Sequence, residues 1–272
     1  MGQQAVPGPG ERMAGGDGQG RSRRGEPRAR LGRAVLPPPA GSATGGVVLV
    51  LPEGDPVSLR RPSLVSHAGV LSLAKSLARS GSAEGLVVHV VRYGLRGWNG
   101  VDARLAADAH WAADEVLRRY GDVPVCLVGH GMGGRAALRA AGHPAVNSAL
   151  AMAPWLPEDD MAGELEPVRQ LVGRQVLIMH GTNDARTDPE LSYRLAERAK
   201  KTNRDICRFE VHSDGHALRQ HHGEVLALAT DFVLGALLSR TYSRPVADAL
   251  AAPPPLGLRM PLAAGFGRSL RR

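Results

Sequence analysis

Six short segments along the chain are almost continuously apolar, and helical patterns separate most of them. Continuous apolar runs, rather than alternating ones, are typical of parallel strands whose sheet is covered on both faces. We therefore expect each run to form one strand of a single sheet. The runs cover residues 47–51, 86–91, 123–128, 147–153, 175–180 and 206–212.

Helices are predicted from apolar residues spaced three and four positions apart and from their start signals. Asp102 stands where an N-cap is expected, and Asp188, followed by proline and glutamate, is a typical helix start. Strands that alternate with helices predict an α/β fold: a doubly wound, mostly parallel six-stranded sheet with helices on both faces. The predicted helices cover 66–79, 102–120, 135–141, a segment that starts at 188, and 223–238.

The two ends of the chain differ in composition from its middle. Residues 1–44 carry seven arginines and three acidic residues, and residues 239–272 carry six arginines and one aspartate, so residues 45–238 are nearly neutral within a chain of net charge +8. We expect both ends to be disordered, residues 45–238 to form the folded domain, and no specific nucleic-acid binding. No apolar run reaches the length of about 18 residues that a membrane span needs, and no signal-peptide pattern is present. We therefore expect no membrane span and a cytoplasmic location.

The third apolar run leads directly into a glycine-rich turn, Gly-His-Gly-Met-Gly-Gly at residues 129–134, before a predicted helix. A strand, a tight turn and a helix form the nucleophile elbow of hydrolases, where the residues two positions before and after the nucleophile are small. The turn resembles the Gly-His-Ser-x-Gly-Gly elbow of the α/β-hydrolase family, with Gly131 in place of the attacking serine. Glycine has no side chain that forms an acyl-enzyme.

The resemblance extends to two further segments. His-Gly-Thr-Asn-Asp follows the fifth run and ends at Asp184, and Ser-Asp-Gly-His follows the sixth and ends at His216. The order of elbow, acid and histidine is that of the α/β-hydrolase family. The resemblance implies a minimal α/β-hydrolase fold with a small lid over residues 153–175. It also implies that Asp184 and His216 are the acid and histidine of a catalytic triad, with Gly131 at the nucleophile position.

The same resemblance suggests the oxyanion hole and the pocket. The backbone N–H of Met132 and the loop after the first strand, with Glu53 and Gly54, are expected at the oxyanion hole. Glu53 departs from the His-Gly or Gly-Gly frequent in the family and places a carboxylate close to the expected oxyanion. The candidate pocket residues are Trp155, Trp98 and Tyr93.

These observations favour a protein that resembles small-substrate ester or acyl hydrolases but in which serine-type hydrolysis is absent or strongly impaired. Any residual reaction would need His216 to activate water. The alternative is a non-catalytic protein that binds a small ligand or a partner in the same cleft. A lesser alternative is nucleotide binding, because Gly129-x-Gly131-x-x-Gly134 matches the dinucleotide fingerprint, although the next strand ends without the acidic residue that holds the ribose. We expect an unidentified small-molecule ligand or substrate, no cofactor and no metal site; His221 and His222 are interpreted as surface histidines or weak metal scavengers.

Overall fold

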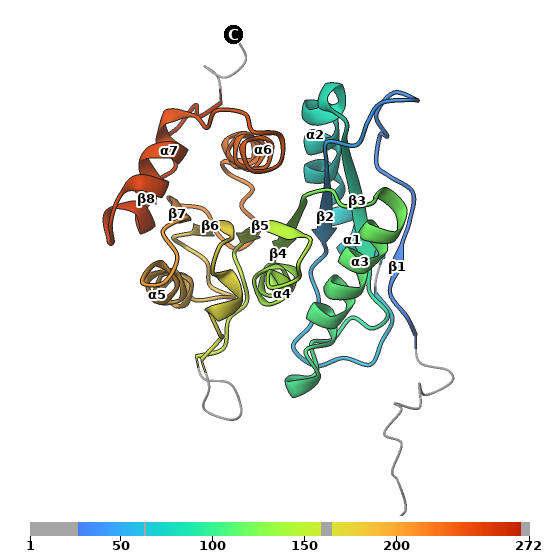
Figure 1. The fold of residues 1–272 in the computed structure, drawn as a ribbon. Coiled ribbons are helices and arrows are strands. Elements are labelled where there is room, and N and C mark those ends of the chain that lie inside the picture. Colours follow the sequence, from blue (N-terminus) through green and yellow to red (C-terminus); the bar gives the residue numbers. More distant parts are fainter. Residues whose placement is uncertain (1–26, 63, 159–164, 268–272) are drawn as a thin grey trace, which may run out of the picture.

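The protein is described here by a computed structural model that covers residues 27–62, 64–158 and 165–267 (Figure 1). Its centre is an eight-stranded sheet with the order β1-β3-β2-β4-β5-β6-β7-β8. The six strands from β2 to β7 are the predicted ones, and neighbours among them pair in parallel. Two strands of two residues each extend the sheet at its edges. The strands are β1 (Arg30–Leu31), β2 (Gly46–Leu51), β3 (Leu86–Arg92), β4 (Val125–His130), β5 (Val146–Met152), β6 (Gln175–Gly181), β7 (Ile206–Val211) and β8 (Met260–Pro261).

Helices cover both faces of the sheet, as predicted. Figure 1 shows α3, α4 and α5 on one face and α2, α6 and α7 on the other, and two separate clusters of buried side chains fill the two layers. The helices are α1 (Leu64–Gly69), α2 (Leu71–Gly81), α3 (Arg104–Tyr120), α4 (Met132–Ala140), α5 (Pro189–Lys200), α6 (His222–Leu238) and α7 (Arg244–Ala251). Short 3-10 turns are η1 (Ser82–Glu84), η2 (Gly100–Asp102), η3 (Arg169–Leu171) and η4 (Leu256–Leu258).

Two helix starts differ in how well the sequence predicted them. Asp188 caps α5 as expected, because its side chain accepts a hydrogen bond from the backbone N–H of Glu190 at 2.8 Å. Asp102 does not cap α3: it lies in η2, and Ala103, with φ +43° and no capping side chain, precedes the helix. The single helix predicted over residues 66–79 is divided into α1 and α2.

The N-terminal segment is partly ordered. Residues 1–26 lie outside the described residues, but β1 pairs antiparallel with β3 and the side chain of Leu31 is buried. Disorder over residues 27–44 was therefore a wrong expectation: a few apolar residues suffice to add a strand to the open edge of the sheet.

The C-terminal segment differs more from its predicted disorder. Residues 268–272 lie outside the described part, but α7, η4 and β8 follow α6 directly. Val246, Ala249 and Leu258 are completely buried, and β8 pairs in parallel with β7. The prolines and arginines of this segment obscured the apolar positions that cover the sheet edge, so the folded unit continues beyond residue 238.

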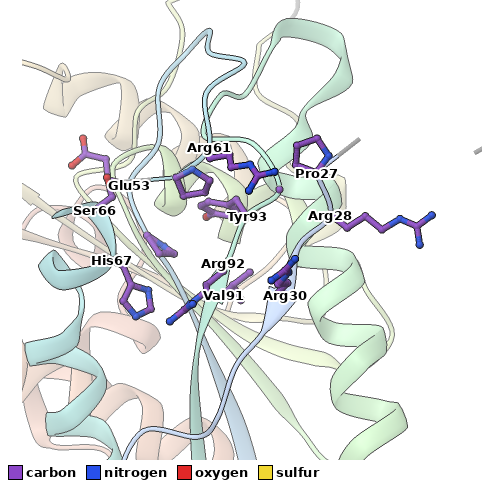
Figure 2. A pocket seen from close by; sticks show the side chains of 13 residues that line it. Pro27, Arg28, Arg30, Glu53, Arg61, Ser66, His67, Val91, Arg92 and Tyr93 are labelled. Carbon is purple, nitrogen blue, oxygen red and sulfur yellow. The ribbon is translucent and has the colours of Figure 1, made fainter. Parts of the chain in front are cut away.

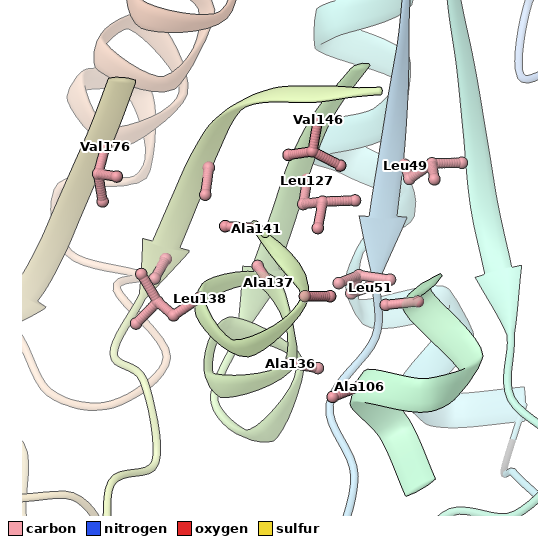
Figure 3. Close-up of a cluster of buried hydrophobic side chains, with 14 of the residues drawn as sticks. Leu49, Leu51, Ala106, Leu127, Ala136, Ala137, Leu138, Ala141, Val146 and Val176 are labelled. Atoms are coloured by element: carbon pink, nitrogen blue, oxygen red, sulfur yellow. The ribbon is translucent and has the colours of Figure 1, made fainter. Parts of the chain in front are cut away.

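The core around the elbow is built from small and aliphatic residues, as the 4% aromatic content requires. Figure 3 shows Ala136 and Ala137 of α4 in one cluster with Leu51 of β2, and all three side chains are completely buried. Small side chains allow the helix to approach the sheet closely, and α4 is the helix that leaves the elbow. In the described part of the chain, no helix combines the length and hydrophobicity needed to cross a membrane.

Candidate active site

The turn between β4 and α4 has the geometry of a nucleophile elbow. β4 ends at His130 and α4 begins at Met132, so Gly131 alone connects them, with φ +56° and ψ −120°. Residues with a Cβ rarely adopt this backbone conformation, and then under strain. The turn is held by β5 and the segment after it: the N–H of Gly131 donates to the carbonyl of Met152 at 2.9 Å, and the N–H of Trp155 donates to the carbonyl of Gly131 at 3.0 Å.

Close packing explains the glycines on either side of the turn. A Cβ on Gly129 would overlap the carbonyl oxygen of Gly133, and a Cβ on Gly133 would overlap the carbonyl oxygen of Leu51. The turn therefore folds tightly onto itself and onto the end of β2. The three glycines that match the dinucleotide fingerprint have local reasons: close packing at Gly129, a positive φ at Gly131, and at Gly134 a carbonyl oxygen of Gly129 that would lie 3.2 Å from an added Cβ.

Glu53 lies where a nucleophile side chain would lie. A Cβ added to Gly131 would be 3.0 Å from Oε1 of Glu53 and 3.1 Å from its Cδ. The sequence placed this carboxylate near the oxyanion hole; the structure places it against the nucleophile position itself. Its side chain is 27% exposed, so the carboxylate is half-buried.

Asp184 and His216 come together as predicted from the family order. Nδ1 of His216 donates to Oδ2 of Asp184 at 2.9 Å, and both side chains are buried. Asp184 also accepts from the hydroxyl of Thr187 at 2.6 Å and from the backbone N–H groups of Arg186 and Thr187 at 2.8 and 3.0 Å. Burial opposes ionisation of Asp184, but hydrogen bonds from His180 and Thr187 hold its pKa well below the usual range. The carboxylate is thus charged and fixed in place.

His216 is bound on its other side as well. Its Nε2 lies 3.2 Å from Oε1 of Glu53, so the imidazole lies between two carboxylates. Burial alone would lower the pKa of His216, but the hydrogen bonds with Glu53 and Asp184 raise it. Nε2 is the atom that takes a proton from the nucleophile in a serine triad. Here Glu53 engages that atom.

Two residues that the sequence analysis did not assign to the site also contact Glu53. Nε2 of His130 donates to the backbone carbonyl of His216 at 2.8 Å, and its Nδ1 lies 3.6 Å from Oε2 of Glu53. Arg186 donates from Nη2 to Oε1 of Glu53 at 2.9 Å. Burial would raise the pKa of Glu53, but its contacts with His130 and His216 hold it well below the usual range. A signal was available in the sequence, because His130 is in the elbow and Arg186 follows Asp184 by two residues.

The expected oxyanion residues have different surroundings. Met132 is the first residue of α4, so its backbone N–H has no acceptor within the helix. A Cβ on Gly54 would lie 2.5 Å from the carbonyl oxygen of Arg96 and 2.6 Å from Cδ1 of Leu105. Close packing is therefore a sufficient reason for glycine at position 54, and an oxyanion role for either residue stays a prediction.

Two cavities border Glu53 and differ in character. The first has a volume of about 250 Å³, and Figure 2 shows Arg61 and Arg92 on either side of Tyr93, with Glu53 at one edge. Its lining includes four arginines, Arg28, Arg30, Arg61 and Arg92. The second has a volume of about 300 Å³, reaches His130, and is mainly apolar, with Val65, Val70, Leu73, Leu218, Val225 and Leu226.

Of the three predicted pocket residues, only Tyr93 lines one of these cavities. Trp98 and Trp155 instead contact the guanidinium of Arg135, which lies 4.1 and 5.3 Å from their ring centroids. Nε of Arg135 donates to the buried Glu166 at 2.7 Å. The two tryptophans therefore pack against the buried ion pair that Arg135 of α4 forms with Glu166. Residues 159–164 of the predicted lid lie outside the described residues.

Solved structures with a similar fold support the architecture. Est1E from Butyrivibrio proteoclasticus, solved with ferulic acid bound, matches with a TM-score of 0.55 and 14% identity over 78% of this chain and 96% of its own. XC6422 from Xanthomonas campestris, described as an α/β serine hydrolase without a lid, matches with a TM-score of 0.53 and 17% identity over 79% and 97%. An esterase from Pyrococcus furiosus matches with a TM-score of 0.57 and 13% identity over 71% and 83%. No family model and no curated protein matches the sequence.

These likenesses establish that the chain has the α/β-hydrolase fold, as the sequence motifs indicated. Sequence identities of 13–17% support a shared fold but not a shared activity.

Proposed function

We propose that this protein does not hydrolyse esters by serine-type chemistry and that it binds a small ligand in the cleft above the elbow. One observation carries the proposal: the carboxylate of Glu53 lies at the nucleophile position beside Gly131 and is hydrogen-bonded to Nε2 of His216. Covalent catalysis needs a nucleophile whose proton passes to the histidine. Position 131 has no such group, and the histidine already has another partner.

The same contact argues against water as a substitute nucleophile. A general base must have a free lone pair within hydrogen-bond reach of the water. Nε2 of His216 faces Glu53, and the raised pKa of His216 favours the protonated imidazole, which has no lone pair to offer. Ligand binding therefore has better support than residual hydrolysis.

The two cavities indicate the chemistry of the ligand. Arg61 and Arg92 line the first cavity, and aliphatic side chains line the second, with Glu53 bordering both. Arginine pairs well with carboxylates, and apolar walls bind apolar surface. The combination fits a small molecule that carries one anionic group and one apolar part.

Esterase assays test the absence of serine chemistry. We expect p-nitrophenyl acetate and butyrate to be turned over no faster by the natural chain than by His216→Ala, and a fluorophosphonate probe to leave residue 131 unlabelled. The double variant Gly131→Ser/Glu53→Ala restores the hydroxyl and removes the carboxylate in its way, so we expect it to be labelled. Turnover by the natural chain that disappears in His216→Ala contradicts the proposal.

Calorimetric titration tests the ligand class. Ferulic acid, with which Est1E was solved, is a suitable first probe because it is an aromatic carboxylic acid. We expect ferulate to bind more tightly than its neutral methyl ester, and Arg61→Gln/Arg92→Gln to remove that preference. Arg79→Gln, a basic residue at the end of α2 that lines neither cavity, is the matched control. Binding that does not discriminate between acid and ester contradicts an anionic ligand.

A further inference from the structure

Three side chains from three separate segments converge at the elbow. Glu53 follows β2, His130 ends β4, and His216 follows β7. One ligand-type atom from each lies within 4.8 Å of the other two. Oε1 of Glu53 lies 3.2 Å from Nε2 of His216. Oε2 of Glu53 lies 3.6 Å from Nδ1 of His130.

The outer hydrogen bonds fix which nitrogen of each imidazole carries a proton. Nε2 of His130 faces the carbonyl oxygen of His216, and a carbonyl only accepts, so this nitrogen carries the proton. Nδ1 of His216 faces the carboxylate of Asp184, so it too carries a proton. When a cation takes the place of the proton that His216 otherwise shares with Glu53, both rings are neutral, and the remaining nitrogens, Nδ1 of His130 and Nε2 of His216, direct lone pairs toward Glu53.

This arrangement brings two nitrogen lone pairs and a carboxylate together. Arg186 donates a hydrogen bond to one oxygen of Glu53. This contact does not reach the two imidazole lone pairs. Groups that only accept repel each other unless a cation lies between them. A proton on His216 relieves this repulsion, and so does a metal ion that is coordinated by all three groups.

We propose that Glu53, His130 and His216 bind one divalent transition-metal ion of the zinc class. Two imidazole nitrogens and a carboxylate oxygen are ligands that zinc accepts readily, whereas calcium and magnesium prefer oxygen alone. Zinc bonds of about 2.0–2.2 Å in tetrahedral geometry place ligand atoms roughly 3.3 Å apart. The separations of 3.2 Å from Nε2 of His216 to Oε1 of Glu53 and of 3.6 Å from Nδ1 of His130 to its Oε2 are close to that spacing, so each imidazole faces one oxygen of the carboxylate.

The surroundings meet two further requirements of a metal site. A metal-bound histidine usually donates its other N–H to a carboxylate or a backbone carbonyl, and here His216 donates to Asp184 and His130 to a carbonyl. Both cavities border Glu53 and the second also reaches His130, so an ion has a path of entry and keeps open positions toward the cleft. The Arg186 side chain is 66% exposed, so it can leave Glu53 when a cation arrives.

The inference goes beyond the proposed function, because the ion would bind whether or not the cavities hold an organic ligand. Its test uses the tag-free, EDTA-treated full chain, with Zn²⁺ as the probe in competition with a chromophoric chelator. We expect one Zn²⁺ per chain. Glu53→Gln and His130→Gln should each weaken binding by at least about 10-fold, since loss of a ligand should cost no less than loss of its outer-shell partner.

The double variant His221→Gln/His222→Gln is the matched control, because it removes two neighbouring histidines outside the cluster. We expect it to bind Zn²⁺ within about 2-fold of the natural chain. X-ray absorption of the Zn²⁺-loaded natural chain needs no variant and should show two imidazole nitrogens at about 2.0–2.1 Å. No stoichiometric binding, binding that survives both ligand substitutions, or binding that the control removes would overturn the proposal.

Discussion

The packing of Glu53 against Gly131 leads to a quantitative prediction about replacing that glycine with serine. The new Cβ would lie 3.0 Å from Oε1 of Glu53 and 3.1 Å from its Cδ, closer than such contacts normally are. The hydroxyl adds one more atom to this crowded position. Glu53 must therefore move, and its contacts with His216 and Arg186 are lost or lengthened.

The size of the effect follows from two contributions. A side chain at φ +56° costs about 1–3 kcal/mol whatever Glu53 does. Displacing Glu53 loses a hydrogen bond to His216, typically about 1.5–3 kcal/mol for charged partners and less here because Glu53 is 27% exposed. The exposed Arg186 contact adds little. We expect Gly131→Ser to destabilise the chain by about 2–5 kcal/mol, and by about 1–3 kcal/mol when Glu53→Ala is already present.

Equilibrium urea unfolding of the natural chain, the two single variants and the double variant measures this coupling. We expect the double variant to be about 1–2 kcal/mol more stable than the sum of the single effects predicts. Gly173→Ser is a matched control, because Gly173 also has a positive φ, +74°, but an added Cβ there meets no atom within 4 Å. Effects at 131 and 53 that add within about 0.5 kcal/mol would refute the view that Glu53 occupies the nucleophile space.

Two further predictions concern pH and the C-terminal segment. The raised pKa of His216 adds stability that is fully present below pH 6.5, the ordinary pKa of histidine, and is lost as the pH rises. The lowered pKa of Glu53 adds stability that is present above pH 4.5, the ordinary pKa of glutamate, and is lost in acid. Glu53→Gln should therefore reduce the free energy of unfolding most between about pH 5 and 6.5 and less at pH 9; an equal loss at both ends would contradict the contact. Val246→Ala should destabilise the chain by about 1–3 kcal/mol in the same assay, since Val246 is completely buried in α7. Val101→Ala, at a residue that is 98% exposed, should have almost no effect, and equal effects at both positions would contradict the packing of α7.

The parts of the fold that the sequence predicted are those with strong local patterns. The six central strands are continuous apolar runs, and the Asp188 cap is a local three-residue signal, so each was recognisable without knowledge of its neighbours. The edge strands β1 and β8 have two residues each, which is too short for any periodicity. Their pairing, like the burial of Val246, depends on an exposed sheet edge elsewhere in the chain.

The same distinction between local and long-range signals applies to the candidate site. Gly131, Asp184 and His216 follow strand ends in a fixed order, so their meeting could be predicted from motif and topology. The side-chain direction of Glu53 could not, because it depends on the empty space beside Gly131 and on donors from two other loops. The tryptophans were misassigned for a related reason: Trp98 and Trp155 contact Arg135, and nothing local to either tryptophan indicates that partner.

The contact between Glu53 and Gly131 also changes the meaning of the missing serine. If only position 131 had changed, the result would be an enzyme lacking one side chain, with Nε2 of His216 facing an empty space. Instead the carboxylate fills that space and binds Nε2. Serine at 131 would crowd Glu53 out of this position, and removing Glu53 would leave a buried nitrogen without its partner. The two residues therefore depend on each other, which favours a site organised around the Glu53–His216 contact over a serine site damaged at one position.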